Sequence, residues 1–189
     1  MAENVTKPKR MRELGPVDIS GFKAIVARTS EHVWNTENEQ KENDFDCFHH
    51  TRHIVFRFIE GFRDHRCFYS TQIWSVWQDQ LMPIMKKVVE PYGFERPEFP
   101  KVMLARLQAG QVIDPHKDGA GSNLYTHKIH VPIQTNEKAR MFINDRSFHL
   151  EEGKAYEVNN LVPHAVENLG AEDRIHLIFE VFDNVESKA

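Results

Sequence analysis

Residues 128–143 read KIHVPIQTNEKARMFI, and this stretch indicates the fold class most clearly. From Lys128 to Gln134 the side chains alternate between two faces, as in a β-strand, and Ala139–Ile143 is a second short strand-like run. Similar runs recur at Val102–Leu107, Ala155–Val158 and Ile175–Phe182. Short strands at about ten-residue spacing are typical of a sandwich or barrel. Asn144-Asp145 and Glu151–Gly153 have the composition of hairpin connections.

The first half of the chain has a different pattern. Apolar residues between Phe22 and Val33 recur at helical spacing, with Asp18 and Ser20 as candidate N-caps. A second helix is predicted from near Ser70 to before Pro91, and Pro83 should kink or shorten it. Asn35–Asp46 is polar and is predicted to be a loop, whereas His53–Ile59 alternates like a strand.

The length of 189 residues fits one domain, residues 1–189. Within it we expect a loosely packed or mobile N-terminus (1–17), a helix-rich support (18–92) and a β-rich core (101–183). The cluster Lys7, Lys9, Arg10 and Arg12 could be a nucleic-acid arm, but a solvated terminus is the more common arrangement.

Composition excludes several classes of protein. The net charge of −4 argues against a nucleic-acid partner, and no apolar window is long enough for a secretory signal or a membrane span. Cys47 and Cys67 match no zinc pattern and form no disulfide framework, so we expect a cytoplasmic protein. The eleven histidines are unusually many, and six lie between His116 and His176.

One segment carries chemistry that the histidine count alone does not reveal. Residues 113–121 read IDPHKDGAG, and His164 follows 46 residues after Asp118. On an extended chain His116 and Asp118 point the same way, and His164 would complete two imidazoles and one carboxylate, the ligand set of non-haem Fe(II) oxygenases. The alternative is that all three are ordinary polar residues beside Pro115 and Pro163.

Arg174 begins the apolar strand that follows. An arginine that faces the interior of a small barrel needs a partner, and a dicarboxylic acid bound to the metal would supply one in bidentate geometry. The alternative is local pairing with Glu172 and Asp173.

From about Val102 to Phe182 the chain resembles the aspartyl/asparaginyl β-hydroxylase family, including its bacterial free-proline hydroxylase relatives. The motifs that carry the resemblance occur in the family's order: ARLQAGQVIDPHKDG, HKIHVPIQTNE, FHLEEGKAYEVNN, VPHAVENLG and DRIHLIF. The helical half matches loosely, through ELGPVDISGF. The resemblance implies a double-stranded β-helix (jelly-roll, cupin-like) core, mainly β with flanking helices.

The resemblance also implies roles for single residues. His116, Asp118 and His164 match the iron ligands, Arg174 matches the residue that binds the distal carboxylate of 2-oxoglutarate, and His130 matches a histidine near that cosubstrate. Lys128 stands where relatives often have arginine, which weakens its assignment to cosubstrate binding. Mammalian-type members replace the carboxylate ligand with glycine, so Asp118 favours the bacterial small-molecule branch.

Other candidates have two readings each. Arg106 could hold a substrate carboxylate or form a structural ion pair. His176, two residues beyond Arg174, should share its face and either line the pocket or be a core imidazole. The cluster of His49, His50 and His53 could line a substrate entrance or be a polar strand end. We expect Trp74, Trp77 and Phe68 to anchor the core.

The sequence therefore predicts an Fe(II)- and 2-oxoglutarate-dependent dioxygenase that uses O2 and hydroxylates a C–H bond while 2-oxoglutarate is decarboxylated to succinate and CO2. The predicted substrate is an amino acid or a small amino-acid derivative, because the chain has few segments beyond the core. The alternatives are the same chemistry on an Asp, Asn or Pro side chain of a peptide or protein, or a cupin-like metal-binding or ligand-binding module without turnover.

Overall fold

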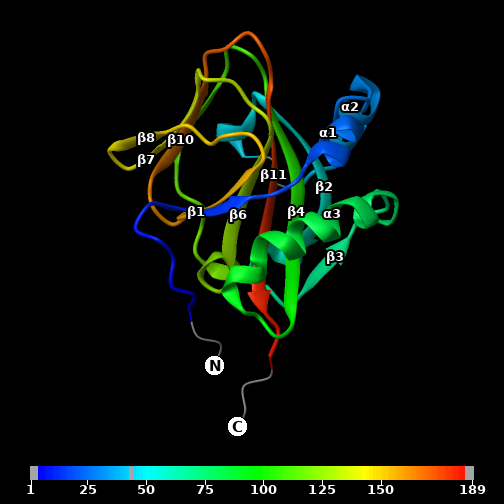
Figure 1. The fold of residues 1–189 in the computed structure, drawn as a ribbon, viewed down its shortest axis with the longest axis vertical. Coiled ribbons are helices and arrows are strands. Elements are labelled where there is room, and N and C mark those ends of the chain that lie inside the picture. Colours follow the sequence, from blue (N-terminus) through cyan, green and yellow to red (C-terminus); the bar gives the residue numbers. More distant parts are fainter. Residues whose placement is uncertain (1–3, 43–44, 186–189) are drawn as a thin grey trace.

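The computed structural model describes residues 4–42 and 45–185, and two antiparallel sheets dominate it (Figure 1). The large sheet has the strand order β1-β9-β6-β11-β4-β2-β3, and the small sheet has the order β5-β10-β7-β8. The large-sheet strands are β1 (Met11–Pro16), β2 (Thr51–Ile59), β3 (Phe68–Ser70), β4 (Pro97–Leu107), β6 (His127–Gln134), β9 (Lys154–Val158) and β11 (Arg174–Asp183). Those of the small sheet are β5 (Val112–His116), β7 (Ala139–Ile143), β8 (Arg146–Phe148) and β10 (His164–Asn168). This is the predicted double-stranded β-helix, mainly β with flanking helices.

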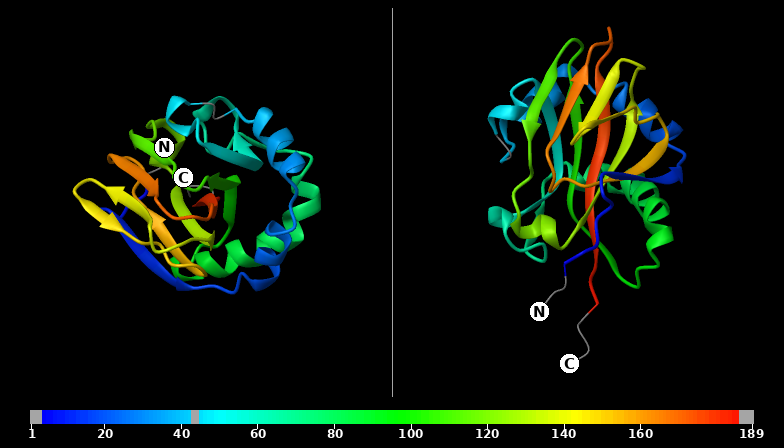
Figure 2. Two further views of the ribbon diagram at one scale, coloured as in Figure 1. Left: turned by 90° about the horizontal axis from the view of Figure 1, so that it is seen from above. Right: turned by 90° about the vertical axis from the view of Figure 1, so that its left-hand side faces the viewer.

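The helices pack on the side of the large sheet that faces away from the small sheet (Figure 2). They are α1 (Ser20–Val26), α2 (Glu31–Glu39) and α3 (Trp74–Val89). Short 3₁₀ turns lie in the connections between elements, at Asp46–Phe48, Glu60–Phe62, Glu90–Tyr92 and Gly121–Leu124. None of the described helices is long and apolar enough to cross a membrane.

Strand β11 shows how one segment serves both the core and the site. Its odd-numbered residues from Ile175 to Val181 belong to the apolar core shared with the helices. Arg174, Ile178 and Glu180 lie on the opposite face, where they line a cavity. Since strand side chains alternate, an apolar residue on one face and a polar residue on the other is what a strand between a core and a pocket requires.

The single helix predicted between Phe22 and Val33 is two helices. Ser30 has extended backbone, and its hydroxyl accepts a hydrogen bond from Val33 N at 3.3 Å. Ser30 therefore caps the N-terminus of α2, and the helix does not run on from α1. Helix α2 continues to Glu39, so the first part of the polar segment 35–46 is helical rather than a loop. Periodicity missed the break because the apolar spacing stays in phase across it.

Helix α3 begins at Trp74 and runs to Val89 without ending at Pro83. Pro83 cannot donate to the carbonyl of Asp79, but both residues are exposed, so water can bind the freed carbonyl oxygen. Of the two predicted effects of Pro83, a kink or a shortened helix, the shortening does not occur.

The N-terminal segment is not loosely packed where the structure describes it. Strand β1 pairs with β9, Lys7 Nζ donates to Thr126 O at 2.8 Å, and Arg10 pairs with Asp145 at 2.5 Å. These partners lie far along the chain, which is why local composition gave no sign of them. Residues 1–3 lie outside the described residues.

Of the two predicted hairpin connections, one is confirmed. Asn144 adopts positive φ (53°) in the turn between β7 and β8, which pair. The turn at Glu151–Gly153 leads from β8 to β9, and these strands lie in different sheets, so it is a crossing between sheets. Turn residues predict a reversal of the chain but not which sheet the next strand joins.

Replacement of the core residue Phe56 by alanine should lower the free energy of unfolding by about 3–5 kcal/mol. Phe56 on β2 is fully buried, and its ring lies 5.4 Å from that of Trp77 on α3. Denaturant unfolding monitored by circular dichroism measures the change. Val76→Ala, at a residue of α3 that is 73% exposed, is the matched control and should shift stability by about 0.5 kcal/mol or less. A loss below about 1 kcal/mol for Phe56→Ala would contradict the packing described.

Candidate active site

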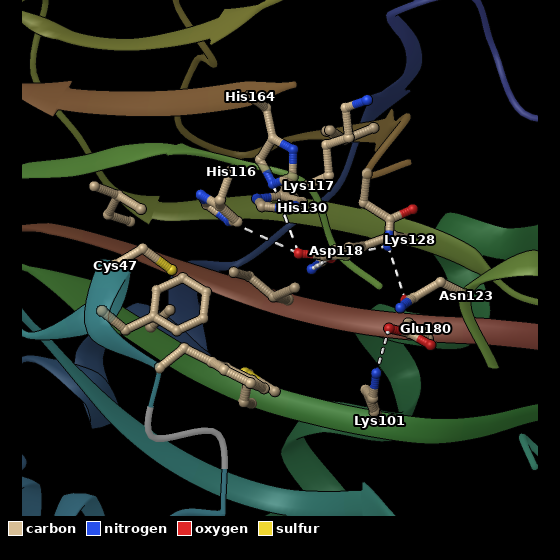
Figure 3. Close-up of a pocket in the computed structure, with 18 of the residues that line it drawn as sticks. Cys47, Lys101, His116, Lys117, Asp118, Asn123, Lys128, His130, His164 and Glu180 are labelled. Atoms are coloured by element: carbon tan, nitrogen blue, oxygen red, sulfur yellow. Dashed lines mark hydrogen bonds and ion pairs between the residues drawn. The ribbon is translucent and has the colours of Figure 1, made fainter. Parts of the chain in front are cut away.

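Two neighbouring strands of the small sheet bring the predicted metal ligands together. His116 is the last residue of β5, His164 is the first of β10, and the two are register partners. Asp118 follows His116 by two residues, and its backbone N donates to Asn160 O at 3.0 Å, which folds the loop back toward the histidines. Figure 3 shows the three side chains converging.

The three donor atoms are close enough to share one cation. Asp118 Oδ1 lies 3.7 Å from His116 Nε2 and 3.8 Å from His164 Nε2, and the candidate ligand atoms all lie within 4.8 Å of one another. Each imidazole donates through Nδ1 to a backbone carbonyl, His116 to Asp114 O (2.8 Å) and His164 to Val162 O (3.0 Å). These bonds leave both Nε2 lone pairs directed at the same point.

The second oxygen of Asp118 is held by two side chains. Lys128 Nζ and Asn160 Nδ2 both donate to Oδ2, at 2.5 and 2.9 Å. Burial would raise the pKa of Asp118, but the charges of Lys128 and His164 together lower it below its usual range. Asp118 is therefore a carboxylate with one oxygen fixed and the other facing the histidines.

The histidine environment also suits metal ligation. Burial lowers the pKa of His164 to about 4, so the imidazole is neutral at physiological pH. Two imidazoles and one carboxylate match the ligand set of Fe(II) oxygenases, and the residues present fit such an ion.

Lys128 and Asn160 change the sequence-based assignment of the site. Lys128 was expected to bind cosubstrate; it lines the cavity but directs its ammonium to Asp118. Asn160 was not predicted, although it also donates to Asn123 Oδ1 at 2.8 Å and ties two loops together. No spacing rule links residue 160 to residue 118, because the contact depends on how the sheets face each other.

A cavity of about 690 Å³ opens beside the ligands, between the two sheets. Arg174 lines it and is 3% exposed, and its Nη2 lies 2.7 Å from His176 Nδ1. No carboxylate of the described residues pairs with Arg174, so local pairing with Glu172 and Asp173 does not occur. Burial lowers the pKa of this guanidinium to about 9. A buried cation without a counter-ion at a cavity wall is favourably placed to pair with an anion that enters the cavity.

His130 and His176 lie beside Arg174. His130 lines the cavity, and its Nδ1 lies 3.4 Å from His176 Nδ1. Burial lowers the pKa of both imidazoles well below the usual value, so both are neutral. His176 does not line the main cavity; it accepts from Arg174 and holds the guanidinium in place.

Arg106 is not in the cavity. Its guanidinium donates to both carboxylate oxygens of Glu31, at 2.6 and 2.7 Å, and lies over the ring of Trp34. The expectation that it binds a substrate carboxylate is wrong, because its side chain leaves the opposite face of β4 and ties α2 to the sheet. The structural ion pair was the alternative reading.

Arg106→Ala should therefore affect stability and spare ligand binding. Glu31 is exposed, so water can solvate its carboxylate once the arginine is gone. We therefore expect the free energy of unfolding to fall by about 1–2 kcal/mol, rather than by the 3–5 kcal/mol that breaking a fully buried pair costs. Chemical denaturation and calorimetric titration with 2-oxoglutarate measure the two properties. A weakened affinity for 2-oxoglutarate with unchanged stability would contradict this placement.

The cluster of His49, His50 and His53 was predicted either to line a substrate entrance or to be a polar strand end, and one of the three lines the cavity. His53 on β2 is 3% exposed, lines the cavity and packs against Phe48, whose ring centroid lies 5.3 Å from that of His116. His49 and His50 are outside the cavity lining. Trp74 and Trp77 are core residues, as expected, whereas Phe68 is half-buried beside Arg57.

Comparison with known families agrees with this site. The profile of the family described as aspartyl/asparaginyl beta-hydroxylase matches residues 22–184. The chain belongs to this family. Membership confirms the prediction of a hydroxylase of the Fe(II)- and 2-oxoglutarate-dependent dioxygenase class, and the matched range includes strands of both sheets.

Solved structures share the fold at low identity. The viral collagen prolyl hydroxylase vCPH of Paramecium bursaria Chlorella virus-1, in a 2-oxoglutarate complex, is 12% identical; the alignment covers 92% of this chain and 96% of that one, with a TM-score of 0.53. A 2-oxoglutarate-Fe(II) oxygenase-family oxidoreductase from Burkholderia pseudomallei is also 12% identical, over 74% and 71% of the two chains, with a TM-score of 0.50. Among curated proteins, no match was found.

Proposed function

We propose that this chain hydroxylates a C–H bond of an amino acid or a small amino-acid derivative, and couples that reaction to oxidative decarboxylation of 2-oxoglutarate to succinate and CO2. His116, Asp118 and His164 hold Fe(II), and Arg174 binds the distal carboxylate of the cosubstrate. The iron, when bound, supplies the coordination of 2-oxoglutarate and the activation of dioxygen.

The observation that carries this proposal is the burial of Arg174 at the cavity wall with no carboxylate partner in the part of the chain that the structure describes. A module that only stores a metal gains nothing from a buried guanidinium at the wall of the same cavity, and the desolvation of that charge destabilises the fold. A dicarboxylate bound in bidentate geometry compensates the charge. Arg174 therefore favours a reaction that uses such an acid over a cupin-like module without turnover.

The other residues prepare the site for this chemistry. Lys128 and Asn160 fix the carboxylate plane of Asp118, and the backbone carbonyls fix both imidazoles. Apolar side chains such as Ile113, Met141 and Val166 line the cavity beside the histidines and exclude water. His176 keeps the guanidinium of Arg174 in one orientation.

Succinate release from 2-oxoglutarate tests the proposal. We expect release that requires added Fe(II), stops with a chelator, and rises when one of the free amino acids is present, with a product that has gained one oxygen atom. Stimulation by peptides alone would replace the small-molecule substrate with a peptide side chain. No iron-dependent release, with or without any of these compounds, would overturn the proposed function.

A further inference from the structure

We propose that Lys101 and Glu180 bind the carboxylate and the ammonium group of an α-amino acid substrate, with its side chain directed along an apolar wall toward the metal ligands. This inference rests on the proposed function and assigns the part of the cavity that the metal and cosubstrate do not use.

The two residues form an ion pair inside the cavity wall. They are register partners on the adjacent strands β4 and β11, and Lys101 Nζ donates to Glu180 Oε1 at 3.0 Å (Figure 3). Their side chains are 12% and 1% exposed, and both line the cavity. Burial of such a pair contributes little to stability compared with apolar residues of similar size, and both charged groups lie where a ligand in the cavity can reach them.

Both side chains retain hydrogen-bonding capacity. An ammonium has three donors, and the pair with Glu180 is the one hydrogen bond that Lys101 donates to the described residues. Its ammonium otherwise lies 5.5 Å from the ring centroid of Phe58. Glu180 Oε2 accepts from Thr126 Oγ1 at 2.7 Å, which leaves lone pairs on each oxygen. The pair can therefore donate to a carboxylate and accept from an ammonium at neighbouring points.

The surrounding charges favour a ligand with a carboxylate. The ammonium groups of Lys7, Lys101 and Lys128 all act on Glu180. Lys128 also pairs with Asp118, but a metal ion bound at the site would share the negative charge of that carboxylate. Lys7 also interacts with Glu157 and Asp118, so Lys101 is the ammonium of the three whose one carboxylate partner among the described residues is Glu180, and a substrate carboxylate would give it a second.

One wall of the cavity between this pair and the metal ligands is apolar. Phe58 and Met103 pack with Ile178 in one cluster, and Phe48 continues the surface to His116. An amino acid whose head group lies at Lys101 and Glu180 would place an apolar side chain along this surface, with its C–H bonds toward the metal.

Anaerobic calorimetric titration of the protein loaded with Fe(II) and 2-oxoglutarate tests the inference without turnover. Leucine, valine, proline and phenylalanine are each compared with their carboxamide and their N-acetyl derivative. We expect at least one free amino acid to bind about tenfold more tightly, or better, than both derivatives, since each loses one charged hydrogen bond. Equal binding of the derivatives, or no binding by any free amino acid, would overturn the inference.

Two variants separate the roles of the pair. Lys101→Met should abolish the discrimination against the carboxamide, and Glu180→Gln should abolish the discrimination against the N-acetyl form. The double variant removes both charges, so no unpaired ion stays buried, and it should lose both discriminations while unfolding cooperatively. Lys87→Met, at an exposed lysine of α3, is the control and should bind like the wild type. Variants that keep wild-type discrimination would refute the assignment.

The proposed function and the role of Lys101 and Glu180 can be refuted independently of each other. Iron-dependent succinate release that persists while Lys101→Met retains its preference for the carboxylate leaves the proposed function standing and removes this inference. Absence of iron-dependent release removes the proposed function itself.

Discussion

His164→Ala is expected to reduce iron-dependent succinate formation by at least about a hundredfold. Removal of a partner that merely orients a metal ligand already costs 10- to 100-fold in affinity or activity, and His164 is a ligand itself. The variant keeps Asp118 with its two donors, so the loss is confined to one Nε2. Succinate formation is measured with saturating 2-oxoglutarate and increasing Fe(II).

The matched control for this prediction is His32→Ala. His32 is exposed on α2, remote from the cavity lining, and its replacement should leave the rate and the iron requirement unchanged. Metal binding by calorimetry gives a second readout, and circular dichroism confirms that the variant is folded. A folded His164→Ala protein with wild-type iron affinity would show that His164 is not a ligand.

Arg174→Ala is expected to weaken 2-oxoglutarate binding by about a hundredfold or more. Loss of one partner of a buried, hydrogen-bonded charge pair costs about 2–5 kcal/mol, and each 1.4 kcal/mol is tenfold in affinity. Metal affinity should change little, because Arg174 contacts none of the three ligands. Titration of 2-oxoglutarate into the Fe(II)-loaded protein without oxygen measures the effect. Arg174→Lys should be intermediate, since it keeps the charge but not the fork.

Arg174→Ala should also differ in stability from a variant of an arginine that holds the fold together. Without ligand, Arg174 is a buried cation with no carboxylate partner among the described residues, so its removal should not lower the free energy of unfolding. Chemical denaturation of the ligand-free protein checks this. Unchanged affinity for 2-oxoglutarate together with a large loss of stability would assign Arg174 to the fold rather than to the cosubstrate.

Local patterns predicted much of the fold. Alternation identified β2, β4, β6, β7, β9 and β11 to within a few residues at most ends, because each has one face in the core. It did not identify β1, β3, β5, β8 or β10. Strand β1 is short, contains Gly15 and Pro16, and is stabilised by pairing with β9. The residues around β1 give no sign of that pairing. Pairing across more than a hundred residues depends on the assembled sheets.

The metal ligands could be predicted from the sequence, whereas the residues that hydrogen-bond to them could not. The His116–Asp118 spacing and His164 are visible in the sequence, and the structure brings them together. Asn160 and the contact between Lys128 and Asp118 depend on the approach of separate loops. Both interpretations of Arg106 stayed open in the sequence, which shows that an arginine needs a partner but not that Glu31 lies within reach.

One missed feature did have a sign in the sequence. The alternation of β11 that places Arg174 toward the cavity also places Glu180 there, six residues later. A buried glutamate on that face required a cationic partner, and Lys101 on the neighbouring strand supplies it. The identity of the partner needed the register of β4 against β11, which only the structure gives.

The most direct test of the central claim follows the oxygen atoms. The protein is incubated with Fe(II), 2-oxoglutarate, the free amino acid that stimulates turnover most, and isotopically labelled dioxygen, and both products are analysed by mass spectrometry. A hydroxylase that couples substrate oxidation to decarboxylation places one labelled oxygen in succinate and one in the hydroxylated amino acid, in equal amounts. Succinate without label, or labelled succinate with an amino acid that is never hydroxylated, would contradict the account.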